Sequence, residues 1–209
     1  MNTDTLLDLI RHYAEFSDVH PAEGLQEFAV WLREKTGHAG PPDNQQSRDI
    51  GYYLNRVNRY ARLYAKLAFK ELPIKSLDEF SFLTTIRHTG QPSKTEVYEA
   101  TLTEITTGAQ LLKRLVALEL VEEIDDAADR RVKRVRLTPT GELVQQSAFE
   151  QIGKECELKM APLDSGARTD LLAILKRLDE VHQPISRNER MISIEALREK
   201  YAKSPGRIF

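Results

Sequence analysis

The chain has 209 residues, of which 41% are hydrophobic and 30% are charged, a composition typical of a soluble globular protein. Its single cysteine, Cys156, excludes an internal disulfide framework, a zinc site with cysteine ligands and a CxxC redox centre. No apolar run approaches the roughly 20 residues of a membrane helix, and the first residues contain no export signal, so we expect a cytoplasmic protein. The net charge is −2, but residues 1–40 hold seven acids and three bases, whereas residues 130–136 hold five bases and no acid.

Two amphipathic helices are predicted in the acidic N-terminal arm, residues 1–40. Apolar residues recur at helical spacing over residues 4–16, and again after Pro21, which suits the first position of a helix. A segment rich in Gly and Pro, residues 37–44, then separates the arm from the rest of the chain. We expect these helices to bury a set of apolar residues against another part of the protein: Leu6, Leu9, Ile10, Leu25, Phe28 and Leu32.

A long amphipathic helix is predicted over residues 47–70, and the Leu72-Pro73 pair ends it. Four tyrosines lie along this helix, and core or helix–helix packing is the simplest role for them. A role in a ligand pocket is the alternative for Tyr60 and Tyr64.

Three capping boxes predict three short helices in the next thirty residues, because Ser or Thr and a Glu three positions later satisfy exposed amides reciprocally. The boxes begin at Ser76, Ser93 and Thr101. The third helix runs to about Leu118, and its predicted buried face consists of Ile105, Ala109, Leu112, Leu115 and Val116. Its opposite face forms one polar stripe: Thr103, Thr107, Gln110 and Arg114.

A basic hairpin follows this helix. Residues 120–124 are predicted as a strand, residues 125–129 as a turn, and a second strand alternates Val135 and Leu137 with bases. Thr138 and Pro139 then suit the N-cap and first position of a helix that runs to about Met160. Two further helices are predicted at residues 168–182 and 194–201.

This order of elements is typical of a winged helix-turn-helix, and two segments resemble the MarR family of bacterial transcription regulators. Residues 111–121 read Leu-Leu-Lys-Arg-Leu-Val-Ala-Leu-Glu-Leu-Val. Residues 129–141 contain Asp-x-Arg and then Leu-Thr-x-x-Gly, which is similar to the wing signature of that family. We therefore expect a mainly α fold with a small β-hairpin wing, in which a winged helix-turn-helix core is joined to a helical dimerisation region.

The expected organisation has three parts. The core occupies residues 74–140, within a body of residues 47–185 that includes the dimerisation helices 47–70 and 139–185. The N-terminal arm precedes this body, and residues 186–209 form a C-terminal extension. The arm is expected to contribute to the dimer interface, and occupation of the basic groove is the alternative.

The resemblance implies a sequence-specific transcription regulator that binds double-stranded DNA, a palindromic operator, as a homodimer and is modulated by a small-molecule effector, with no cofactor. By resemblance, Arg131 enters the minor groove and Asp129 orients the wing through ion pairs. The candidate DNA-binding residues are Ser93, Lys94, Thr103, Thr106, Thr107, Gln110, Lys113, Arg114, Arg130, Arg131, Lys133 and Arg134.

One residue departs from the family pattern, and two further functions compete. Glu119 stands where the family has a glycine; a left-handed C-cap would strain it, so we expect a different helix end or a reshaped loop. The slight negative charge favours a winged helix that binds protein rather than DNA. An enzyme has little support, because the chain lacks a nucleophile elbow, a P-loop, a dinucleotide fingerprint and metal-ligand spacing.

Cys156 is expected to be a small buried residue, with redox sensing as the alternative.

Overall fold

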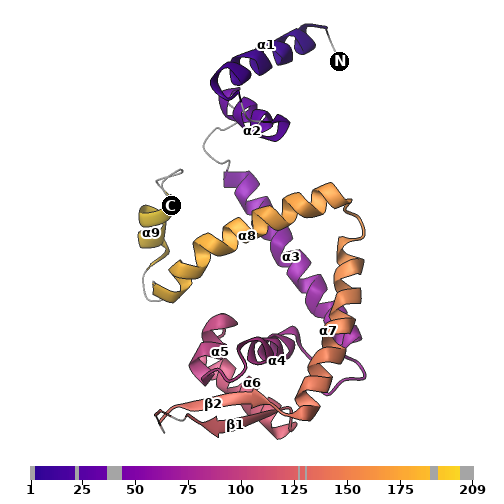
Figure 1. Cartoon of the computed structure of the whole chain (residues 1–209), viewed down its shortest axis with the longest axis vertical. Helices are drawn as coiled ribbons and strands as arrows, with labels where there is room; N and C mark the ends of the chain where they lie inside the picture. The colour runs from indigo at the N-terminus through magenta and orange to yellow at the C-terminus, as the bar shows by residue number, and fades with distance from the viewer. Residues whose placement is uncertain are drawn as a thin grey trace. The chain divides into compact units, whose positions relative to one another are not determined.

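The structure is a computed structural model that describes residues 3–21, 24–36, 44–126, 128–129, 131–188 and 193–202. The described part is predominantly helical and contains a two-stranded antiparallel sheet, which confirms the predicted fold class (Figure 1). The chain divides into two compact units, Met1–Val57 and Asn58–Phe209. Among the described helices, none has the length and apolar character needed to cross a membrane.

The first unit contains two helices that pack on each other, α1 (Thr3–Val19) and α2 (Leu25–Lys35). Phe16 and Phe28 are buried between them, with ring centroids 5.4 Å apart, and Lys35 forms an ion pair with Glu15. Aromatic packing therefore joins the two helices, because this small unit has few other apolar contacts to bury.

One prediction for this unit is wrong, and another stays untested. The second helix begins at Leu25 rather than at Pro21, because the backbone N–H of Gly24 donates to the Glu27 carboxylate (3.0 Å) and so sets the first turn later. Of the apolar residues expected to be buried, Phe28 is buried and Leu32 half-buried in the single chain. Four others are exposed there, so their burial in a dimer interface stays a prediction: Leu6, Leu9, Ile10 and Leu25. The predicted break lies mainly at residues outside the described part.

Helix α3 (Asn44–Ala68) confirms the predicted long helix and continues into the second unit. There Ala61, Ala65 and Phe69 are buried. Helices α4 (Leu77–Thr89) and α5 (Lys94–Ala100) follow. Both begin with the predicted capping boxes, since the Glu79 and Glu96 backbone N–H groups donate to the hydroxyls of Ser76 and Ser93 at 3.1 and 3.2 Å.

The third predicted capping box does not form. Thr101 is instead the C-cap of α5, and its hydroxyl donates to the Val97 carbonyl (2.8 Å). Leu102 adopts a left-handed backbone (φ 52°), and the Thr103 N–H donates to the Tyr98 carbonyl (2.8 Å), which closes the helix as a Schellman motif. Helix α6 (Ile105–Ala117) therefore starts three residues later than predicted, and Thr103 lies in the turn before it.

The wing consists of β1 (Val121–Asp125) and β2 (Lys133–Leu137), in a register that pairs Val121 with Leu137 and Asp125 with Lys133. The segment before α5 pairs briefly with β2. The Val135 N–H donates to the Pro92 carbonyl (2.9 Å), and Ser93 and Arg134 form an isolated antiparallel β-bridge. The hairpin is thus attached to the helix-turn-helix by backbone bonds, which limits its movement relative to α5.

Helix α7 (Pro139–Met160) begins as predicted, because the Thr138 hydroxyl accepts the Gly141 N–H at 3.0 Å. Helix α8 (Ser165–Asn188) and the short α9 (Ile194–Leu197), which continues into a π-helical turn, confirm the two C-terminal helices. One core joins α4, α5, α6, the wing and the start of α7. Its fully buried residues include Phe82, Leu83, Ile86, Val97, Leu112, Leu115, Val121, Val135 and Ala148.

Candidate nucleic-acid interface

Helix α6 is attached to the core by Gly108, Leu112 and Leu115, which are all buried. A Cβ atom on residue 108 would lie 2.5 Å from the Tyr98 ring, so the glycine allows α5 and α6 to pack closely. The predicted burial of Leu112 and Leu115 is confirmed, whereas that of Ile105 and Ala109 is wrong. Because Gly108 and Tyr98 form the contact, the first turn is rotated and Ile105 is 65% exposed.

The exposed face of α6 carries uncharged polar groups and one base. At 100° per residue, Thr106, Gln110 and Lys113 lie opposite the buried Gly108, Leu112 and Leu115, and all three are exposed. Thr107, which is also exposed, lies on the flank of this face. This surface offers hydroxyl, amide and ammonium groups, which suit the hydrogen-bonding edges of bases in a major groove.

Two residues of the predicted stripe do not belong to this surface. Thr103 precedes the helix, and its hydroxyl lies 2.9 Å from that of Thr101. Arg114 is in the last turn of α6, where its Nε is 2.6 Å from Oε1 of the buried Glu79. The stripe therefore is not one continuous face, because α6 begins after Thr103 and Arg114 pairs with α4.

The bases of β2 are paired with acids. Lys133 forms an ion pair with Asp125, Arg134 with Asp126, and Arg136 with Glu122 (2.7 Å). At the start of α5, Lys94 pairs with Glu123 in the same way (2.7 Å). The composition of residues 130–136 alone suggested a basic strand without acidic partners. The antiparallel register instead places acids of β1 opposite Lys133 and Arg136, and Arg134 pairs with Asp126 just after β1. The sequence did contain a signal for this pairing, because the first strand is rich in acids and the second strand is rich in bases.

Arg134 connects the wing to the start of α5. Its Nε pairs with Asp126, one Nη donates to the Gln91 carbonyl (2.8 Å), and Glu96 lies 3.7 Å away. The pKa of Asp126 falls to about 2, first because of Arg134 and then because of the backbone N–H groups of Asp129 and Ala128. Arg134 thus has a structural role beside any contact with DNA.

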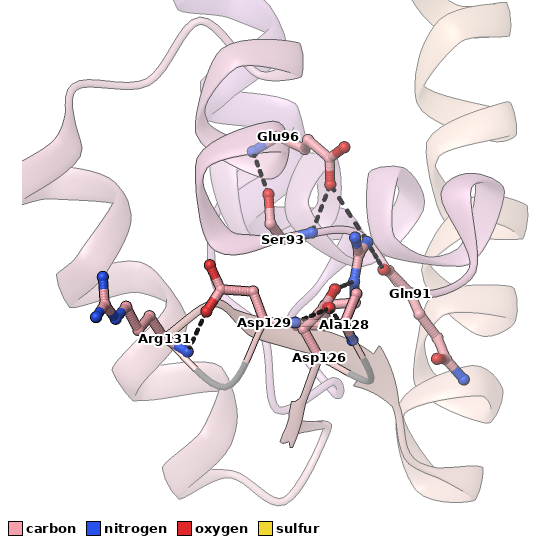
Figure 2. A network of polar contacts seen from close by, with 8 residues as sticks. Gln91, Ser93, Glu96, Asp126, Ala128, Asp129 and Arg131 are labelled. Carbon is pink, nitrogen blue, oxygen red and sulfur yellow. Dashed lines mark hydrogen bonds and ion pairs between the residues drawn. The ribbon is translucent and has the colours of Figure 1, made fainter.

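The turn of the wing is built by two aspartates (Figure 2). Asp126 accepts the N–H groups of Ala128 and Asp129 (2.7 and 2.9 Å), and Asp129 accepts the N–H of Arg131 (2.9 Å). Asp129 therefore orients the turn through a backbone bond, while Asp125 and Asp126 supply ion pairs. Arg131 is exposed and its side chain points away from this network in Figure 2. Within the described part of the chain it makes no ion pair, and Arg130 lies outside that part.

The candidate effector residues lie on α3. The rings of Tyr60 and Tyr64 stack with centroids 6.5 Å apart. A separate open hollow of about 500 Å³ lies between α4 and α7, and neither tyrosine lines it. Its lining is polar with one aromatic wall: Thr84, Arg87, His88, Gln145, Gln146 and Phe149.

Cys156 is exposed on α7, so its predicted burial is wrong. Partial burial of the sulfur nevertheless raises the pKa of the thiol. A raised pKa disfavours the reactive thiolate, which argues against redox sensing.

Comparisons with known proteins agree with this geometry. Residues 77–141 match the family model of a winged helix DNA-binding domain. An HTH-type transcriptional repressor of Pseudomonas putida, NicR, is 27% identical over 150 residues, covering 70% of this chain and 94% of the relative.

Two solved structures show the same fold. A mutant of E. coli MarR complexed with operator DNA has a TM-score of 0.58 at 21% identity, covering 62% of this chain and 93% of that one. The structure of Bordetella bronchiseptica BpsR, whose DNA binding is regulated by 6-hydroxynicotinic acid, has a TM-score of 0.59 at 23% identity, covering 67% and 98%. Residues 77–141 are therefore similar to winged helix DNA-binding domains, and the chain shares the fold of E. coli MarR and BpsR.

Proposed function

We propose that this protein regulates transcription by binding a palindromic DNA operator as a homodimer, and that a small molecule modulates the binding. One observation carries the proposal: the exposed face of α6 with Thr106, Gln110 and Lys113 occurs in the same domain as a wing whose tip presents Arg131. A helix of this kind suits the major groove, and an arginine at a wing tip suits the narrow minor groove beside it.

The homodimer is proposed from α8 and from the size of one module. In the single chain, large apolar residues of α8 remain exposed: Leu172, Ile174, Leu175 and Leu178. Such a surface is stabilised when a second copy covers it. A two-fold dimer also doubles the number of base contacts, since each recognition helix then reads one half-site.

Effector control is proposed from the hollow between α4 and α7. Arg87 and His88 there offer cationic and hydrogen-bonding groups, and Phe149 offers an aromatic face. These groups suit a small aromatic acid, which is the class of compound named for BpsR. Gln145 is buried, donates to Thr84 (3.3 Å) and accepts from Arg87, so a ligand in the hollow would compete for bonds that connect α4 to α7.

Fluorescence anisotropy with a labelled random-sequence duplex tests the DNA-binding proposal. We expect binding at low salt, with an affinity that falls linearly against salt concentration on logarithmic axes, because counterions are released from the phosphates. Duplexes enriched from a random pool should contain inverted repeats with half-sites about one helical turn, ~34 Å, apart.

The second candidate is a winged helix that binds another protein. The pairing of Lys133, Arg134 and Arg136 with acids favours it, because these bases are already neutralised within the wing. Absence of salt-dependent binding to any duplex in the anisotropy experiment would select this candidate instead.

A further inference from the structure

We propose that Glu79 is a positioning residue for DNA recognition, and that it sets the orientation of α6 through Arg114. This inference rests on the proposed DNA-binding function. Only 3% of the Glu79 side chain is exposed, and its Oε1 lies 2.6 Å from Nε of Arg114, whose side chain is 52% exposed. The attraction in this ion pair is strengthened by burial of the carboxylate, because the local dielectric constant is lower than that of water.

The Glu79 carboxylate uses its two oxygens for two different elements. Oε2 accepts the backbone N–H groups of Lys75 and Ser76 (2.5 and 3.1 Å), which completes the capping box of α4. Oε1 receives Arg114 from α6. The start of α4 and the last turn of α6 are thus joined by one buried group, although the two residues are 35 positions apart in the chain.

Helix α6 is otherwise held mainly by close packing, which includes the contact of Gly108 with Tyr98. Its N-cap residue, Glu104, makes no side-chain cap bond, and its buried contacts are apolar. Close apolar packing sets the spacing of the helices, and an ion pair to a fixed, buried carboxylate adds a polar restraint on rotation. Arg114 is one turn after Gln110 on the helix surface, so the ion pair restrains the part of α6 that presents Gln110.

The same geometry assigns Arg114 a role different from that of a base-reading residue. Its Nε is bound to Glu79, and a base-reading arginine would direct its donors to guanine. Arg114 therefore supports recognition by holding the helix that carries Thr106, Gln110 and Lys113.

The test uses Glu79→Gln, which keeps an oxygen acceptor for the cap but removes the charge that binds Arg114. The matched control is Glu96→Gln, because Glu96 has the same place in the capping box of α5 and its side chain is 56% exposed. Arg114→Lys is the second variant: it keeps the charge at a half-exposed position and removes the Nε atom that lies 2.6 Å from Glu79 Oε1. Each protein is measured by thermal unfolding and by anisotropy with two probes, a duplex enriched by the wild type and a random-sequence duplex.

We expect Glu79→Gln and Arg114→Lys each to lower the specificity ratio, which is the affinity for the enriched duplex divided by that for the random duplex, by about tenfold. The double variant should have about the same ratio as either single variant. Affinity for the random duplex and its salt dependence should not change. Glu96→Gln should alter the ratio by less than about twofold, since its ion pair is exposed.

Three results would overturn the inference: a folded Glu79→Gln variant with an unchanged ratio, effects that add in the double variant, or an Arg114→Lys variant that keeps the wild-type ratio. If Glu79→Gln does not fold, Arg114→Lys alone decides. Failure of the wild type to bind either duplex would contradict the proposed function itself, and is thus distinguished from failure of the positioning role.

Discussion

Gly141 lies against the carbonyl group of Leu120, so closely that a Cβ atom on residue 141 would stand 1.9 Å from the carbonyl oxygen. The same carbonyl accepts the N–H of Thr138 (3.1 Å), and the Thr138 hydroxyl accepts the N–H of Gly141. The first turn of α7 therefore packs on the junction between α6 and the wing. This contact explains why the Leu-Thr-x-x-Gly motif ends in glycine.

We expect Gly141→Ala to destabilise the fold by at least about 3 kcal/mol, because a methyl group cannot be accommodated against backbone atoms. Gly153→Ala is the matched control: it lies in the same helix with nothing within 4 Å, and alanine should raise stability there by about 0.5–1 kcal/mol. Urea denaturation measures both variants. Equal stabilities would show that the wing junction yields to the added methyl group.

Glu119 has a left-handed backbone (φ 57°), and the Leu120 N–H donates to the Leu115 carbonyl (3.0 Å). The helix thus ends in the Schellman motif in which glycine is common, and the expected reshaping of the helix end is wrong. Glu119→Gly should raise stability by about 0.5–1 kcal/mol, because relief of strain exceeds the added unfolded-state entropy. Glu119→Ala, which keeps a Cβ atom, should show no such gain in the same denaturation experiment.

Gln110 and Thr107 are expected to read base edges from the exposed side of α6. Replacing either with alanine should lower discrimination between operator and random duplexes by about 1–3 kcal/mol while leaving non-specific affinity unchanged. Thr103→Ala is the control, since Thr103 lies in the turn and binds Thr101. Equal losses for both kinds of duplex would indicate contacts to the DNA backbone.

Arg131→Ala should weaken DNA binding and reduce the salt slope by about one, with thermal stability unchanged, because the side chain is exposed at the wing tip. Lys133→Ala is the matched control, two residues away and paired with Asp125. Its effect on affinity should be smaller, since the charge that it removes is already compensated. Gel-shift titrations at several salt concentrations distinguish the two variants, and identical losses would contradict a special role for the wing tip.

The turn of the wing should depend on acid pH through Asp126. Its pKa of about 2 is below the ordinary value of 3.8, so ionisation of this group stabilises the folded wing. That contribution is complete above about pH 3.8 and is lost as the pH falls through about 2. In NMR titrations, the amides of Ala128 and Asp129 should shift with a midpoint near pH 2, and Asp126→Asn should abolish the transition. A midpoint near 3.8 would show that Arg134 does not stabilise the carboxylate.

The sequence by itself determined the features that depend on neighbouring residues. The capping boxes at Ser76 and Ser93, and the Thr138-Pro139 helix start, follow from hydrogen bonds within one turn. The hairpin follows from alternation of apolar and basic residues around an aspartate-rich turn. These local rules were sufficient for the order of elements and for the winged fold.

Only the tertiary structure decided which candidate groups are available to DNA. Thr101 and Glu104 satisfy the capping-box pattern, yet packing of Tyr98 against Gly108 accompanies a helix start at Ile105 instead. Arg114 pairs with the distant Glu79, and the bases of β2 pair with acids across the hairpin. Sequence patterns record the charge and spacing of each residue, but a charge is neutralised or left free by partners that folding brings together from distant positions.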